Sequence, residues 1–282
     1  MSLKYLLALA FFLTAISAKA QYHSVYINQG INSSLDSLSF PQLAINNTKS
    51  FSSKPAVIRL EQGDSLRLWI HNRTQDTLSL ELEQHGSILV PAQDSSLLRS
   101  LPSARQQLLY VNTQFPNKKN FGAAALVHTD QQAQKHYFWC LQEFEKSKNE
   151  ALDSGLVVNW STYYPNAFFI NGEAKPDIDL DPSAKVTGNV GDTILIHMAN
   201  MGAAAHSLHF HGYHAEVIFS NLHPHHVGRS KDTFPLLPME CVSIRLVPHQ
   251  PGEYPVHDHN LVAVSGNGIY PNGMFLTLVI QE

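Results

Sequence analysis

The chain has 282 residues, of which 44% are hydrophobic and 15% are charged, and its formal net charge is −4. This composition excludes an intrinsically disordered chain, and the mild negative charge argues against nucleic-acid binding, which needs a basic face. Histidine is unusually frequent: of the 16 histidines, 11 lie between His197 and His259. The C-terminal half is therefore where we expect the chemistry of the protein.

Residues 1–20 have the pattern of a secretory signal peptide. Lys4 precedes the apolar run Tyr5–Ile16, and Ala18-Lys19-Ala20 has the spacing of a cleavage site. The run is too short to span a membrane, and no later stretch reaches about 18 apolar residues. We expect an exported chain, periplasmic or extracellular, without a membrane span; a buried first helix is the alternative.

Short segments with alternating apolar residues indicate an all-β protein. Ser65–His71 and Thr193–His197 both alternate as half-buried strands do, and 15 Gly and 15 Pro separate such segments. A helix is expected only over Glu143–Asp153, where Glu and Lys are dense and no β pattern occurs.

This pattern repeats once along the chain. Gly63-Asp64 recurs 128 residues later as Gly191-Asp192, and His85-Gly86 recurs 126 residues later as His211-Gly212. The repeat divides the mature chain into unit one (21–130) and unit two (135–282). We expect each unit to be an antiparallel β-sandwich or barrel.

Two H-x-H pairs in unit two are the strongest metal-binding signal. Side chains two residues apart in a strand share a face, so His209 and His211 point the same way, as do His257 and His259. On neighbouring strands they would present four imidazoles to one place, and imidazoles without a thiolate suit copper, zinc, iron or nickel. The alternative is four ordinary surface or core histidines.

Two further features remain open. Cys140 and Cys241 are the only cysteines of the chain; they could form a disulfide in an exported protein or remain two buried thiols. The segment His223–His226 could recruit a metal or be a solvated loop.

Unit two resembles the last cupredoxin domain of multicopper oxidases, whose motif order is H-P-x-H-x-H-G, R-D-T, I-R, P-G-x-Y/W and H-C-H. The matching segments follow in the same order and with similar spacing over about 75 residues: His206–Gly212, Arg229–Thr233, Ile244-Arg245, Pro251–Tyr254 and His257–His259. The two-unit layout also resembles copper nitrite reductases. The resemblance implies two tandem cupredoxin-like Greek-key barrels or sandwiches, copper as cofactor, and a homotrimer as a possible assembly.

The resemblance also implies a role for each histidine of these motifs. His209 corresponds to a ligand of the type 2 copper, and His211, His257 and His259 correspond to ligands of the type 3 pair. His206 stands at the position of a blue (type 1) copper ligand.

Several positions depart from the family pattern. Asp258 replaces the blue-copper cysteine, Ala263 replaces the second blue-copper histidine, and Met274 could be the axial ligand only across an insertion. A blue site needs a thiolate together with two histidines, so we expect type 1 copper to be absent. Because a buried carboxylate is costly without a partner, we expect a hydrogen bond between Asp258 and His206.

Unit one is depleted of ligands as well. The first H-x-H-G motif of the family appears as Glu83-Gln-His85-Gly86, and the second falls near 110–113, where no histidine occurs. Glu83 and His85 share a strand face. We therefore add both as possible helper ligands, from the same chain or from a neighbouring subunit.

Three functions are compatible with this pattern. The one we favour is an exported copper-binding protein for storage, delivery or tolerance, without blue-copper electron transfer. The others are a divergent copper oxidoreductase (an oxidase or a nitrite-reductase-like enzyme) and a metal-free cupredoxin scaffold. Loss of the type 1 site, through which electrons enter laccases, counts against the enzyme; no substrate is indicated.

Overall fold

The structure is a computed structural model, and it describes residues 20–35, 38–101, 104–111, 121–130 and 135–282. The expected signal peptide lies almost entirely outside these ranges, so export stays a prediction. Within the described residues, none of the helices has the length and apolar character needed to cross a bilayer.

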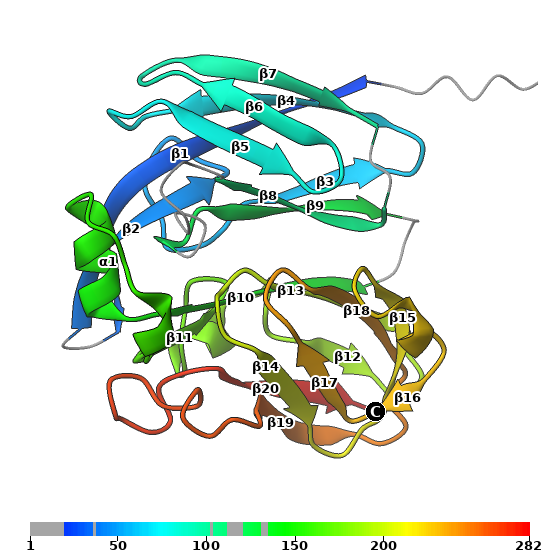
Figure 1. Ribbon diagram of the computed structural model, residues 1–282. Helices are drawn as coiled ribbons and strands as arrows, with labels where there is room; N and C mark the ends of the chain where they lie inside the picture. The colour runs from blue at the N-terminus through cyan, green and yellow to red at the C-terminus, as the bar shows by residue number, and fades with distance from the viewer. Residues whose placement is uncertain (1–19, 36–37, 102–103, 112–120, 131–134) are drawn as a thin grey trace, which may run out of the picture.

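The described strands form four sheets that stack one on another, two in each domain (Figure 1). Domain one contains sheet A, in the order β2-β1-β4-β7, and sheet B, in the order β3-β9-β8-β5-β6. Its strands are β1 (Ala20–Leu35), β2 (Leu38–Asn46), β3 (Val57–Glu61), β4 (Ser65–Asn72), β5 (Leu78–Leu82), β6 (Gly86–Val90), β7 (Ser95–Ser100), β8 (Gln106–Val111) and β9 (Ala124–Asp130).

Domain two contains sheet C, in the order β11-β10-β13-β18-β15-β16, and sheet D, in the order β12-β20-β19-β14-β17. Its strands are β10 (Lys135–Phe144), β11 (Ala167–Ile170), β12 (Thr187–Asn189), β13 (Ile194–Asn200), β14 (His206–Phe210), β15 (Ala215–Ser220), β16 (Ser230–Lys231), β17 (Thr233–Leu236), β18 (Cys241–Leu246), β19 (Gly252–Asp258) and β20 (Phe275–Gln281). Sheet D forms the outer layer of this domain (Figure 1).

The two domains repeat one topology, which confirms the all-β tandem cupredoxin-like fold. The order β2-β1-β4-β7 of sheet A recurs as β11-β10-β13-β18 in sheet C, and β3-β9-β8-β5 of sheet B recurs as β12-β20-β19-β14 in sheet D. The sheets are mixed, whereas antiparallel sandwiches or barrels were expected. Each sheet holds one parallel pair, for example β1 with β4 and β10 with β13, because crossover connections return the chain beside an earlier strand.

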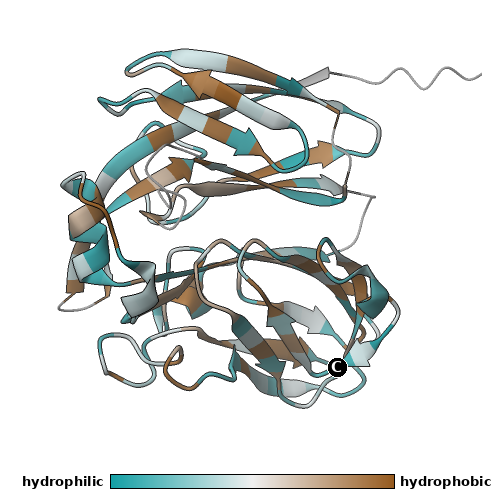
Figure 2. Ribbon diagram, in the orientation of Figure 1, coloured by the Kyte–Doolittle hydropathy of each residue, from teal (hydrophilic) through white to brown (hydrophobic). Residues whose placement is uncertain are grey.

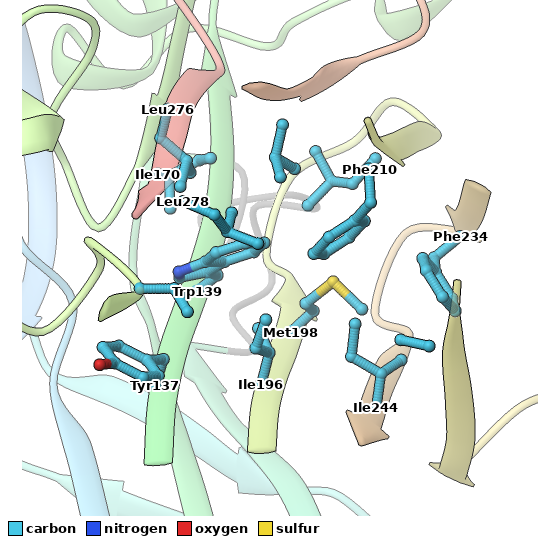
Figure 3. Packing of buried hydrophobic residues seen from close by; sticks show 14 of the residues in the cluster. Tyr137, Trp139, Ile170, Ile196, Met198, Phe210, Phe234, Ile244, Leu276 and Leu278 are labelled. Carbon is cyan, nitrogen blue, oxygen red and sulfur yellow. The ribbon is translucent and has the colours of Figure 1, made fainter. Parts of the chain in front are cut away.

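Burial follows the position of each strand in the stack. In β4 every second residue is buried, as in a strand with one face on a core, whereas all seven residues of β13 are buried because sheet C is covered on both faces. Apolar and polar residues alternate along many strands (Figure 2). Between sheets C and D, Trp139 stacks on Phe210 with 5.7 Å between ring centroids, beside Ile196 and Met198 (Figure 3).

Sheets B and C meet across the boundary between the domains. Leu108, Ala124 and Leu126 of sheet B pack against Phe138 and neighbouring residues of sheet C in one apolar cluster. At the edge of this interface, Lys54 Nζ lies 2.6 Å from Asp181 Oδ2. The domains are therefore held together by a packed sheet-on-sheet contact as well as by the connecting chain.

The two cysteines are buried, unpaired members of that interface cluster. Ala199 pairs with Cys140 on one side and with Cys241 on the other, so one complete strand separates the two thiols. Two strand spacings amount to about 10 Å, which is beyond the reach of a disulfide. The structure thus favours two buried thiols over a bond.

Helical structure in the described residues is limited to α1 (Lys146–Asp153) and the 3-10 turns η2 (Trp160–Thr162), η3 (Asp177–Leu180) and η4 (Pro224–His226). The helix expected over Glu143–Asp153 therefore starts three residues later. Glu143 and Phe144 end β10 instead because both are buried, with the Phe144 ring 5.2 Å from that of Phe40. Tertiary burial outweighs the local helical composition at these two positions.

Candidate metal centres

The two H-x-H pairs come together on the outer face of sheet D. His209 on β14 lies directly opposite His257 on β19. The centroid of the His209 ring is 4.8 Å from that of His211, 5.8 Å from that of His257 and 5.6 Å from that of His259. We call these four residues the four-histidine patch; the strand period correctly predicted that they share a face.

Hydrogen bonds from Nδ1 fix the orientation of two of these rings. His209 donates from Nδ1 to Thr233 Oγ1 at 2.9 Å, while the Thr233 hydroxyl donates to Asp232. His257 donates from Nδ1 to the backbone carbonyl of Asp258 at 2.9 Å. Both rings therefore keep a lone pair on Nε2, which is the arrangement commonly found for metal-ligating histidines.

The patch is open to solvent and favours neutral imidazoles. His211 and His259 are exposed, whereas His209 and His257 are half-buried. Partial burial, and then the neighbouring His209 and His257, lower the pKa of His211 below its ordinary value. A neutral ring is the form that binds metal, so the patch favours the binding-competent state.

The donor set fits copper. The Nε2 atoms of His211 and His257 are 3.0 Å apart. Two nitrogens bound about 2.0–2.1 Å from one ion at a near-right angle are separated by about 3 Å, so this pair needs little movement to share an ion. Imidazoles suit copper, and the four rings offer no thiolate.

The inner face of the same strands carries a buried acid–base pair. His206 is 1% exposed, and its Nδ1 lies 2.5 Å from Asp258 Oδ2, which confirms the hydrogen bond expected from the sequence. Its other ring nitrogen, Nε2, lies 3.0 Å from Glu143 Oε2, a partner that the sequence did not indicate. We call His206, Asp258 and Glu143 the buried triad.

Backbone amides complete this triad. Glu143 accepts hydrogen bonds from the amides of Ala203 at 2.6 Å and Ala204 at 2.8 Å, and Asp258 accepts one from Asn260 at 2.9 Å. Burial alone would lower the pKa of His206, but the hydrogen bonds and charges of Asp258 and Glu143 outweigh it and raise the pKa to about 9. His206 is therefore a charged residue with both ring nitrogens engaged.

Ala263 and Met274 adjoin the triad at the positions that the family motif assigns them. Asp258 donates its amide to the carbonyl of Met274 at 3.1 Å, and Met274 donates its own amide to the carbonyl of Ala263 at 2.8 Å. Both residues are fully buried. Asp258, His206, Ala263 and Met274 thus lie next to one another.

Comparison with known proteins agrees with this geometry. Residues 154–279 match the family model for multicopper oxidases. The matched range covers most of the second domain, which is therefore similar to a domain of multicopper oxidases. No curated protein sequence matches the chain.

Solved structures extend the likeness of fold to both domains. The blue copper oxidase of Nitrosomonas europaea superimposes with a TM-score of 0.79 at 15% identity, covering 93% of this chain and 86% of that one. The copper nitrite reductase of the same organism gives 0.71 at 12% identity, with 94% and 95% covered. A laccase from Botrytis aclada gives 0.70 at 13% identity, with 91% and 52% covered.

The possible helper ligands Glu83 and His85 lie elsewhere in the chain. Both belong to the turn between β5 and β6 in sheet B, where Glu83 Oε1 accepts a hydrogen bond from the side chain of Asn221 at 3.0 Å. Sheet C separates this turn from the outer face of sheet D (Figure 1). A site that joins these residues to the four-histidine patch therefore does not form within one chain, because sheet C lies between the turn and the patch.

Two other groups of histidines stand outside the predicted site. His223, just before the turn η4, has its Nδ1 2.8 Å from Glu240 Oε1, and the rings of His225 and His226 within the turn are 4.4 Å apart. His128, His136 and His197 form a compact cluster at the domain interface. The sequence missed this cluster because its members follow no H-x-H spacing: His128 and His136 lie on the strands that flank the domain boundary, but His197 lies 61 residues after His136.

Proposed function

We propose that this chain is an exported copper-binding protein that holds copper at the four-histidine patch and lacks a blue-copper centre. The observation that carries the proposal is the convergence of His209, His211, His257 and His259 on one exposed face. The match of residues 154–279 to the multicopper oxidase family model supports copper as the ion.

At the patch, copper would supply a redox-active ion of the type 2 or type 3 kind. The chain contributes the imidazoles, and Thr233 and the Asp258 carbonyl orient two of them through Nδ1. Because His211 and His259 are exposed, an ion can arrive from solvent without opening the fold. These properties suit capture and release of an ion.

The buried triad supports the absence of type 1 copper. A carboxylate stands where the thiolate of a blue site would be, and it already forms a hydrogen bond with His206. Neither cysteine substitutes for that thiolate: both are buried between sheets B and C, and burial raises the pKa of Cys140 to about 12. Without a type 1 centre an organic donor has no route for its electrons, which favours storage, delivery or tolerance over turnover.

A homotrimer remains part of the proposal. The patch faces outward from sheet D, and within one chain it is separated from Glu83 and His85. A neighbouring copy could cover the patch with its own domain one. Light scattering of the copper-loaded protein measures the assembly directly, and a monomer would contradict this part of the proposal.

Metal stoichiometry tests the copper site. After loading with copper and removal of free ion, mass spectrometry should show that His209→Ala combined with His257→Ala lowers the copper content by at least one ion per chain. His249→Ala, which removes a histidine of domain two outside the patch, is the matched control and should change nothing. Unchanged copper in the double variant would contradict the proposal.

A further inference from the structure

The domain interface holds a second histidine cluster, far from the four-histidine patch. His128 lies on β9 of domain one, whereas His136 and His197 lie on β10 and β13 of domain two. One ring nitrogen from each residue lies within 4.8 Å of one ring nitrogen from each of the other two. We propose that these three residues bind one divalent transition-metal ion, zinc or copper, and that the ion cross-links the two domains.

The strand period explains why three separate strands meet here. Val127, Tyr137 and Ile196 point into the cores of their own domains, so the adjacent residues His128, His136 and His197 point into the space between sheets B and C. The ring centroids of His128 and His197 are 4.0 Å apart across the domain boundary. The cluster thus depends on the packing of the domains, and an ion bound there would link them.

The distances suit a shared ion after small side-chain movements. His136 Nδ1 and His197 Nε2 are 2.9 Å apart. Nitrogens bound at about 2.0–2.1 Å to one tetrahedral ion are separated by about 3.4 Å, so this pair must open slightly and His128 must move inward.

A hydrogen-bond relay already orients the central ligand. Ser243 donates its hydroxyl to Gln106 Oε1 at 2.8 Å and therefore accepts from Nδ1 of His197, also at 2.8 Å. This leaves the lone pair of His197 on Nε2, directed at His136. Ser243 belongs to domain two and Gln106 to domain one, so this outer support also crosses the interface.

Burial favours a structural ion with one route of access. His128 and His197 are each 1% exposed, whereas His136 is half-buried and lines a cavity of about 440 Å³. The cavity also contacts Lys54 and Arg59. These cations suit a water or small anion as fourth ligand, and the cavity gives the ion an entry path.

The test uses the full chain carrying His209→Ala and His257→Ala, so that the patch does not contribute. Zn²⁺ and Cu²⁺, each titrated alone, should bind at about one ion per chain and raise the melting temperature. Adding His136→Gln should abolish this binding and the rise in melting temperature. Adding His225→Ala instead, in the exposed η4 turn, should leave both unchanged.

His136 is the half-buried member, so its replacement is the variant expected to fold normally. X-ray absorption of the zinc-loaded chain that carries His209→Ala and His257→Ala provides a readout that does not depend on the His136→Gln substitution. It should show three imidazole nitrogens at about 2.0–2.1 Å. Absence of binding by both ions, or full binding after His136→Gln, would overturn the proposal even if the patch itself binds copper.

Discussion

Strands β14 and β19 carry two histidine sites on opposite faces, and the two have opposite characters. On the inner face His206 is buried and charged and binds two carboxylates. On the outer face His209 and His257 belong to a solvent-facing group of four rings that contains no carboxylate. The same two strands thus hold one site whose histidine is already bound by protein carboxylates and one site whose histidines are accessible to an ion from solvent.

This contrast shows how the strand pleat allows one site to change without the other. Successive side chains point to opposite faces, so an aspartate at position 258 alters the inner pocket while His257 and His259 stay in place. In the inner pocket both ring nitrogens of His206 are engaged by carboxylates, those of Asp258 and Glu143. The patch and the pair of His206 and Asp258 share the backbone of β14 and β19, but their side chains lie on opposite faces of the sheet.

Removal of the inner carboxylate should produce the largest effect. Asp258→Ala leaves His206 Nδ1 and the Asn260 amide without their acceptor in a buried place. We expect a loss of about 3–5 kcal/mol in the free energy of unfolding, measured with urea, because one partner of a buried pair is removed. Asp258→Asn keeps an acceptor and should lose less, and copper content should be unchanged. An Asp258→Ala protein of unaltered stability would show that the triad is not a structural lock.

The triad should also make stability depend on pH. The pKa of His206 is raised from 6.5 to about 9 in the folded protein, so its contribution is complete below about pH 6.5 and disappears as the pH rises through about 9. At about 1.4 kcal/mol per unit, the free energy of unfolding should fall by about 3 kcal/mol over this range. Urea unfolding at several pH values measures it, with His206→Gln as the control that should flatten the decline. A wild-type curve as flat as that of His206→Gln would contradict the prediction.

Removing a single ligand on the outer face should lower copper affinity strongly and stability only slightly, the reverse of what is expected for Asp258→Ala. His257→Ala removes one imidazole and the Nε2 contact with His211. We expect the affinity for copper to fall by more than about 100-fold, since even outer-shell changes cost about 10–100-fold. The free energy of unfolding should change by less than about 1 kcal/mol because the side chain is only half-buried. Isothermal titration and urea unfolding of the same sample would separate the two effects. A large loss of stability would contradict the expectation that the outer histidines contribute little to folding.

The smallest effect is expected from removing the hydroxyl of Thr233, which orients His209 by a hydrogen bond. Thr233→Val keeps the shape of the side chain but removes the oxygen that orients His209. Copper affinity should fall by about 10-fold, the lower end for outer-shell partners. Ser207→Ala, on the same strand as His209 but outside the patch, is a suitable control. If both variants bind copper equally, Thr233 does not position the ligand.

Sequence reasoning was most successful where spacing along one strand decides the geometry. Residues two apart share a face, so the grouping of His209 with His211 followed directly, as did the opposite direction of Asp258. The repeated Gly-Asp and His-Gly pairs likewise predicted two similar domains. These features depend on local pattern, which a sequence displays.

Contacts between elements far apart in the chain were not predictable in this way. Glu143 lies 63 residues from its partner His206, inside a segment whose composition suggested a helix. The cluster of His128, His136 and His197 exists only because sheets B and C pack face to face. Glu83 shares a strand pattern with family ligands, yet it contacts Asn221.

The visible absorption spectrum of the copper-loaded protein tests the central claim most directly, because it reports binding and the kind of site together. We expect at least one copper bound per chain, measured by mass spectrometry on the same sample, with only weak visible absorption. An intense blue band near about 600 nm, the signature of a copper–thiolate bond, would contradict it by showing a type 1 centre.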